Sequence, residues 1–228
     1  MNSLYLYHHL GLGDHIICNG LVREMCSRYE RVYLFVKEHN WESVSFMYRD
    51  VGILECLVEK DDRGVEAFIK KNRITNVLKI GFEKLDRKTS FDQSFYKQAG
   101  IDFTKRWSTF YVKRDQLRER GLFNYFNLKE NEYVFLHEDR ERGYVLNREH
   151  IQNRDLRVVH PVKGVTSNIF DYCSVLQKAK EVHCIDSSFR LLADSLELRS
   201  HQLYHHVYVR GSKATDVSSS KLAWVELR

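Results

Sequence analysis

The chain has 228 residues, of which 43% are hydrophobic, 13% aromatic and 29% charged, and its formal net charge is +5. This length suits one large α/β domain or two small ones. The positive charge is modest and dispersed, which fits an anionic small molecule such as a nucleotide. The chain lacks an aromatic-and-basic RNA-binding signature, zinc-finger spacing and a basic tail, so we predict no nucleic-acid partner.

Cysteine usage and apolar runs indicate the cellular compartment. The cysteines are odd in number and mostly flanked by apolar residues, which predicts reduced core thiols at Cys18, Cys26, Cys56, Cys173 and Cys184. The N-terminal segment lacks a basic region followed by a long apolar stretch, and no apolar run reaches the roughly 18 residues that a membrane span needs. We therefore predict a soluble, cytoplasmic protein without a transmembrane segment.

The predicted elements of the first half alternate between strands and helices. Apolar runs predict strands at 4–7, 31–37, 55–58 and 76–80, and helical spacing predicts helices at 16–29, 41–48 and 65–71. This alternation is typical of right-handed βαβ units in a parallel sheet. A more polar section follows, with helices predicted at 91–99 and 114–126 and an extended stretch at 107–112.

A second α/β series then begins. Strands are predicted at 133–137, 156–160 and 181–185, helices at 169–178 and 190–196, and extended pieces at 203–209 and 223–227. We place the domain boundary near residue 115. The prediction is an α/β fold with parallel sheets, in which two small Rossmann-like halves, 1–115 and 116–228, face each other across a ligand-binding cleft.

The strand–loop–helix junction that opens the first half carries Gly11, Gly13, Asp14 and His15. Glycine lets the backbone turn tightly and approach a bound group, and the helix that follows directs unpaired N–H groups to the same place. Asp14 is either the N-cap of this helix or a general base that takes a proton from a hydroxyl held over the loop. His15 either assists that chemistry or is a partly exposed residue at the helix start.

The second half has a polar turn after strand 181–185, with the sequence Asp186-Ser187-Ser188-Phe189, followed by Arg190. Hydroxyls and N–H groups at a helix start can hold a diphosphate, and Arg190 could neutralise the charge of a leaving nucleotide. The alternatives are a serine N-cap and a solvated surface arginine.

Arg140 and Arg142 follow strand 133–137. Their guanidinium groups suit phosphates, but acidic residues are interleaved with them, so a self-paired surface loop is the alternative. No histidine pairs with cysteine or aspartate at metal-ligand spacing, which predicts no catalytic metal. The chain has no nucleophile elbow, no Walker loop and no third glycine of the dinucleotide fingerprint, and we predict no cofactor.

Together, the two loops resemble those of GT-B fold glycosyltransferases, most closely the ADP-heptose lipopolysaccharide heptosyltransferase family. Gly13-Asp14 matches the Gly-Asp pair of that family, which implies that Asp14 is the base for the acceptor hydroxyl. Asp186-Ser187-Ser188 looks like the family's donor-binding Asp-Thr/Ser-Gly motif. The family's histidine after this motif is absent here, so the resemblance does not imply ADP-heptose as the donor.

Ser187-Ser188-Phe189 is also similar to the nucleotide-binding turn of protein O-fucosyltransferases, in which an arginine near the position of Arg140 and Arg142 binds the donor. These resemblances imply a metal-independent glycosyltransferase that moves a sugar from a GDP-, ADP- or UDP-linked donor to a glycan or other hydroxyl acceptor. The chain is shorter than typical GT-B enzymes. The alternative is therefore a non-catalytic nucleotide-sugar-binding or scaffold α/β protein.

Overall fold

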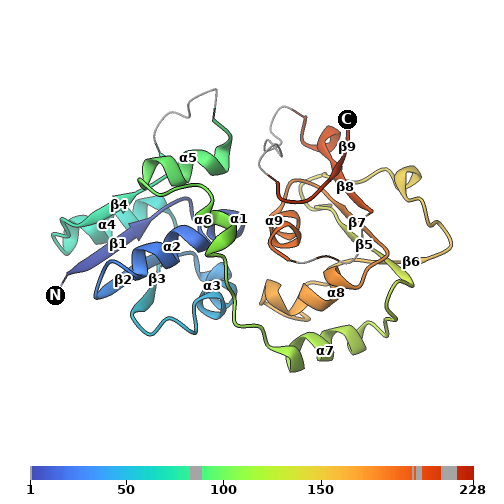
Figure 1. Ribbon diagram of the computed structural model, residues 1–228, viewed down its shortest axis with the longest axis horizontal. Coiled ribbons are helices and arrows are strands. Elements are labelled where there is room, and N and C mark those ends of the chain that lie inside the picture. Colours follow the sequence, from blue (N-terminus) through green and yellow to red (C-terminus); the bar gives the residue numbers. More distant parts are fainter. Residues whose placement is uncertain (1, 83–88, 197, 199–201, 212–219) are drawn as a thin grey trace. The chain divides into compact units, whose positions relative to one another are not determined.

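The computed structural model describes residues 2–82, 89–196, 198, 202–211 and 220–228. The chain divides into two compact units, Met1–Lys113 and Arg114–Arg228, and each unit has its own sheet (Figure 1). All strand pairings between the named strands are parallel, which confirms the predicted α/β class with parallel sheets.

The sheet of the first unit is built on short apolar strands. Its order is β3-β2-β1-β4, with β1 (Ser3–Tyr7), β2 (Arg31–Val36), β3 (Leu54–Val58) and β4 (Val77–Lys79). Leu6 of β1 pairs in register with Leu34 of β2, and both side chains are fully buried. Burial on both faces is expected of a parallel sheet that helices cover.

Two short helices, α1 (Leu12–Ile17) and α2 (Asn19–Cys26), take the place of the single helix predicted at 16–29. Helix α1 begins at Leu12, and Gly11 occupies its N-cap. The N–H groups of the first turn have no partner within the helix. Cys18 separates the two helices with φ −80° and ψ 1°. The elements between the later strands are η1 (Glu38–Asn40), α3 (Trp41–Met47) and α4 (Asp62–Lys71).

The first unit ends with α5 (Phe91–Gln98) and α6 (Lys105–Ser108), and α6 corrects the extended stretch predicted at 107–112. Asn19 fastens the residues after α6, since its Nδ2 donates to the Tyr111 carbonyl (3.2 Å) and its Oδ1 accepts from the Tyr111 N–H (3.0 Å). A Cβ added at Gly20 of α2 would overlap the carbonyl oxygen of Lys105. Helices α2 and α6 therefore pack backbone against backbone at this point.

The sheet of the second unit has the order β6-β5-β7-β8-β9. Its strands are β5 (Tyr133–His137), β6 (Arg157–Val159), β7 (Glu181–Cys184), β8 (Leu203–His206) and β9 (Val225–Leu227). The other elements are α7 (Gln116–Tyr125), η2 (Arg148–His150), η3 (Ile169–Tyr172), α8 (Cys173–Gln177), α9 (Ser188–Asp194) and η4 (Val207–Val209). The strand predicted at 203–209 thus ends at His206.

A row of hydrogen-bonded side chains crosses this second sheet. Glu181 accepts from the N–H of Gln152 (3.1 Å) and from His183 Nε2 (2.8 Å). His183 Nδ1 lies 3.0 Å from His206 Nε2, and His206 Nδ1 lies 3.1 Å from the hydroxyl of Tyr208. The carboxylate and both imidazoles are buried, whereas Tyr208 is 36% exposed. The row therefore links the core of the second unit to its surface.

Candidate functional site

Each sheet has one place where the chain reverses its direction of winding. In the first sheet this place lies between β1 and β4, and in the second it lies between β5 and β7. Such a place is called the switch point of the sheet. Ligands of open α/β sheets bind there, in the crevice outside the carboxyl ends of the strands. Asp14 comes shortly after the end of β1, and the turn 186–189 comes directly after β7. Both predicted loops thus lie at the edge where their own sheet is expected to bind a ligand.

Asp14 is the third residue of α1 rather than its N-cap, because Gly11 holds the N-cap position. Its carboxylate lies against the Gly11 backbone, so that a Cβ added at Gly11 would be 2.6 Å from Asp14 Oδ2. The side chain is half-buried. Negative charge in the first turn of a helix is favourable. The local structure therefore holds a carboxylate in place at the sheet edge, where it could accept a proton.

His15 is fully buried, which corrects the expectation of a partly exposed residue. Its ring meets that of His8 edge-on, with centroids 4.4 Å apart. Burial lowers the pKa of His8 to about 4 and that of His15 well below its usual value, so both imidazoles are neutral at physiological pH. His15 is therefore a neutral, buried residue that packs against His8.

Aromatic rings gather around His9, two residues after the end of β1. His9 packs against Phe82, Phe91 and Phe95, with ring centroids 5.1, 5.9 and 5.6 Å away. Gly81, which follows β4, has φ +90°, and a Cβ there would press on Phe95 and His9. Only glycine adopts this conformation readily. An aromatic cluster thus lies where the chain leaves β1 and β4, the two strands that flank the switch point of the first sheet.

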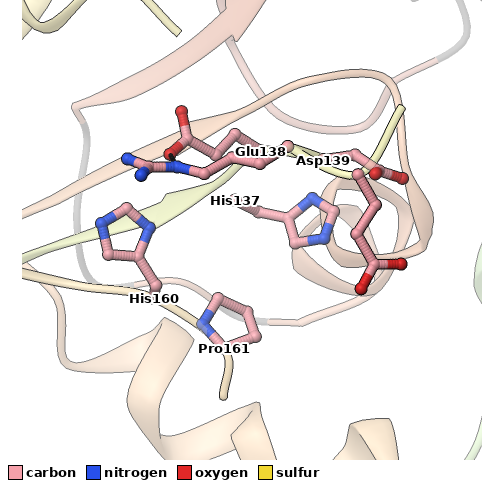
Figure 2. Close-up of a pocket in the computed structure, with 7 residues that line it drawn as sticks. His137, Glu138, Asp139, His160 and Pro161 are labelled. Atoms are coloured by element: carbon pink, nitrogen blue, oxygen red, sulfur yellow. Dashed lines mark hydrogen bonds and ion pairs between the residues drawn. The ribbon is translucent and has the colours of Figure 1, made fainter. Parts of the chain in front are cut away.

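The second unit has a cavity of about 460 Å³ at the carboxyl ends of β5 and β6 (Figure 2). Its lining residues are His137, Glu138, Asp139, Arg140, Glu141, His160 and Pro161. His137 and His160 are not among the site residues predicted from the sequence. A usable signal was present, since His137 is the last residue of β5 and His160 follows β6 directly.

Arg140 and Arg142 pair with acidic residues of their own loop. Arg140 Nε donates to Glu138 Oε1 (2.6 Å), and Arg142 Nε donates to Asp139 Oδ2 (2.5 Å). Arg140 and Arg142 thus belong to a self-paired loop, as in the alternative interpretation of the sequence. Burial alone would raise the pKa of Glu138, but hydrogen bonds from the Leu146 N–H and Arg140 outweigh it and lower the pKa. Glu138 thus anchors the loop as a carboxylate.

Arg190 is buried, and the alternative of a solvated surface arginine is wrong. Its guanidinium lies between Asp186 Oδ1 (3.6 Å) and Asp194 Oδ2 (3.3 Å). Arg210 NH1 also donates to the Asp186 carbonyl (2.8 Å). Arg190 is therefore part of an ion-pair network that fixes α9 to the end of β7.

Ser187 takes the N-cap position of α9, yet its hydroxyl makes no capping bond, and Ser188 is the first helical residue. Within the described chain, the buried Ser187 Oγ has no hydrogen-bond partner. Phe189 is buried, and its ring lies 4.7 Å from that of His137 and 5.2 Å from that of Tyr172. The polar turn thus brings an unpaired hydroxyl and the N-terminus of a helix to the switch point of the second sheet.

No three histidine, cysteine or acidic side chains among the described residues are grouped so that they could hold a metal ion. Every helix in the described part of the chain is too short or too polar to cross a bilayer.

No protein-family model and no curated protein sequence matches the chain. Its fold does match solved structures. A family 9 glycosyl transferase from Veillonella parvula is 10% identical with a TM-score of 0.60, and the match covers 99% of this chain and 86% of that chain. The ADP-heptose lipopolysaccharide heptosyltransferase II of E. coli is 10% identical with a TM-score of 0.54, covering 90% and 84% of the two chains.

The E. coli heptosyltransferase WaaC with ADP-2-deoxy-2-fluoro heptose is 12% identical with a TM-score of 0.51, covering 100% of this chain and 93% of that chain. The resemblance to heptosyltransferases is thus confirmed at the level of the fold. The similarity to protein O-fucosyltransferases stays a prediction.

Proposed function

We propose that the protein is a glycosyltransferase that moves a sugar from a nucleotide-sugar donor to a hydroxyl acceptor in the synthesis of a glycan or polysaccharide, without a catalytic metal. The observation that carries this proposal is the likeness in fold to glycosyltransferases, which extends over both units. The position of each predicted loop at the switch point of its own sheet supports it.

In this proposal Asp14 acts as the general base. Transfer of a sugar to a hydroxyl requires removal of the hydroxyl proton, and a carboxylate within hydrogen-bond reach can accept it. Gly11 and Gly13 let the acceptor approach the backbone, and the buried His15 packs against His8 next to them. The proposed site of this reaction is the cytoplasm.

The donor diphosphate would lie at the turn formed by Asp186, Ser187, Ser188 and Phe189, where Ser187 Oγ has no partner among the described residues. Arg190 would add positive charge from its buried position, reduced by its two acidic neighbours. Arg140 and Arg142 would reach the donor by exchanging their carboxylate partners for phosphate oxygens. One structural neighbour is an ADP-heptose lipopolysaccharide heptosyltransferase and another is a heptosyltransferase with ADP-2-deoxy-2-fluoro heptose, which favours a nucleoside diphosphate sugar as the donor here.

One observation favours a second candidate, a non-catalytic nucleotide-sugar-binding protein. The arginines of the second unit that were predicted to meet phosphate are all paired with carboxylates. Leaving-group stabilisation in glycosyl transfer depends on uncompensated positive charge. A protein that only binds the donor has less need of such charge.

Nucleotide binding tests both candidates. The intact protein would be screened by thermal shift with UDP, GDP, ADP and CMP and their sugars, and a ligand at 100 times its Kd should stabilise the fold by about 2.7 kcal/mol. A failure of every nucleotide and nucleotide sugar to raise Tm would overturn the proposed function.

The variant Asp14→Asn separates an enzyme from a binder. It should lower the rate of sugar transfer at least about 100-fold, because the amide cannot accept the proton, while nucleotide affinity stays unchanged. Release of nucleoside diphosphate from the donor found in the screen gives the rate. Asp155→Asn, at an exposed position of the second unit, serves as the control and should keep full activity. Wild-type protein that binds the donor but transfers no sugar would support the binding protein instead.

The variant Gly11→Ala tests the placement of the Asp14 carboxylate. The added methyl would be 2.6 Å from Asp14 Oδ2, and the end of this side chain can move aside at little cost to stability. We expect the transfer rate to fall about 10- to 100-fold from misplacement of the base, with Tm nearly unchanged. Gly52→Ala, where a Cβ meets nothing within 4 Å, is the matched control. Full activity in Gly11→Ala would show that this placement is unimportant.

A further inference from the structure

His137 lines the cavity and is uncommitted, by which we mean that a buried polar atom of its side chain has no hydrogen-bond partner among the described residues. The charged side chains of the wall are paired, with Glu138 on Arg140 and Glu141 on Lys163. His160 Nε2 lies 3.2 Å from an Arg148 nitrogen. By contrast, His137 Nδ1 is buried and has no hydrogen-bond partner in the described chain. Buried polar atoms in native structures are rarely left without one, so this atom calls for a partner that arrives from outside.

The backbone and ring of His137 are both held at the switch point. Its carbonyl accepts from the Ile185 N–H (3.2 Å), which ties the end of β5 to the end of β7. Its ring lies against Phe189 in the first turn of α9, at 4.7 Å and 39° between planes. Figure 2 shows the ring among the lining residues, between the segment at Glu138 and Asp139 and the Pro161 side of the cavity.

A second uncommitted group lies at the same edge of the sheet. Ser187 Oγ, at the start of α9, is likewise buried without a partner among the described residues. Strand β5 leads to His137 and strand β7 leads to Ser187, and these two strands flank the switch point. Two groups without hydrogen-bond partners among the described residues thus follow the two strands that flank the switch point of the second sheet.

We propose that His137 is a donor-binding residue whose imidazole takes up a proton from solvent as it hydrogen-bonds the diphosphate of the nucleotide sugar. This inference rests on the proposed function. It names a residue outside the predicted site, and it makes donor binding depend on pH.

The groups around His137 keep its imidazole neutral until a ligand binds. Burial lowers the pKa of His137 to about 4, with His160 and Arg142 acting in the same direction and Asp139 and Glu138 against them. Phe189 of α9 contributes no charge. The imidazole is therefore neutral in the empty cavity at pH 7. A diphosphate beside Nδ1 would favour the imidazolium form, and the bound state would hold one more proton than the free state.

Calorimetric titration of the intact protein with a nucleotide sugar measures this proton directly. The probe is the nucleoside diphosphate sugar that gives the largest thermal shift among the UDP, GDP and ADP sugars. Binding heats are compared at pH 6.5 in two buffers with different enthalpies of ionisation. The diphosphate of a nucleotide sugar does not titrate near this pH, so any proton taken up belongs to the protein. We expect uptake approaching one proton per bound ligand, and tighter binding as the pH falls from about 8 to 6.

Two variants separate hydrogen bonding from proton uptake. His137→Asn keeps a nitrogen near the position of Nδ1 but cannot gain a proton, so it should bind without proton uptake. His137→Phe should pack against Phe189, bind at least about 10-fold more weakly and show no uptake. His150→Asn, outside the cavity in the same unit, is the control and should keep both the affinity and the uptake of the wild type.

The outcomes are distinct. If the wild-type protein binds no nucleotide sugar, the proposed function fails, and the role of His137 fails with it. If the wild-type protein binds one without proton uptake, or if His137→Phe binds as tightly as the wild type, only the role of His137 is overturned.

Discussion

Lowering the pH from 7.5 to 5 is expected to unfold the protein, because burial holds many histidines neutral. The fold lowers the pKa of seven histidines, and burial is the largest cause for each of them: His8, His15, His137, His160, His183, His205 and His206. The pKa is about 4 for His8, His137 and His205, and about 3 for His206. All four would have a pKa of about 6.5 in the unfolded chain.

Because these histidines have lower pKa values in the folded state than in the unfolded chain, the protein loses stability as the pH falls. Above about pH 7.5 these histidines are neutral in both states, and the folded state has its full stability. As the pH falls through 6.5 the unfolded chain gains protons that the folded chain refuses until about pH 4. Each such histidine costs up to about 1.4 kcal/mol of unfolding free energy per pH unit, so the three in the second unit, His137, His205 and His206, together cost up to about 4 kcal/mol per pH unit. A typical domain has only about 5–15 kcal/mol in total.

Thermal unfolding followed by circular dichroism from pH 7.5 to 5 measures this dependence, and Tm should fall steeply below pH 6.5. In His205→Phe the dependence should be weaker by one histidine's share, since neither ring nitrogen of His205 has a partner among the described residues. His39→Gln, at an exposed position, should keep the wild-type slope. A Tm that stays constant between pH 7.5 and 5 would contradict the buried, neutral state of these histidines.

The variant Gly20→Ala should destabilise the first unit severely. The new Cβ would overlap the carbonyl oxygen of Lys105 and press on the Tyr96 hydroxyl at 3.2 Å. The main obstacle is backbone, so α2 and α6 must move apart, which would disturb the buried ion pair between Arg106 of α6 and Asp92 of α5. We expect a loss of about 3 kcal/mol or more, which lowers Tm by roughly 6–12 °C in a chain of this size.

Gly121→Ala is the matched substitution in an open place. Gly121 lies within α7, and a Cβ there meets nothing within 4 Å. Alanine favours helix over glycine, so this variant should gain about 0.5–1 kcal/mol. Urea unfolding of both variants gives the two free energies. If the two substitutions changed stability in the same direction, the close approach of α2 and α6 would not exist.

The sheets were within reach of sequence reasoning, whereas several side-chain environments were not. Short apolar strands that alternate with helices predict parallel sheets, and they form here. Gly11 and Gly13 predict a loop before the first helix, but α1 begins at Leu12 because a first helical turn tolerates glycine. The spacing of Asp186 and Asp194, each four residues from Arg190, was a signal in the sequence for its ion pairs.

Other features depend on pairings that no local pattern contains. His183 and His206 meet only because β7 lies beside β8, and the sequence does not state the order of strands. The uncommitted Nδ1 of His137 likewise depends on the ring of Phe189 and on the closed ion pairs of the neighbouring loop. Hydrogen-bonding partners that lie far apart in the chain are set by tertiary packing alone.

The hydrogen bonds in the row from Glu181 to Tyr208 all run in one direction, with each donor on the side of Tyr208. A carboxylate can only accept, so His183 carries its hydrogen on Nε2, His206 carries its hydrogen on Nε2, and the Tyr208 hydroxyl points inward to His206 Nδ1. Each imidazole is thereby confined to a single tautomer. A change at the half-exposed tyrosine would be transmitted along the row to a glutamate in the core, and the ring nitrogens would report it as altered ¹⁵N resonances.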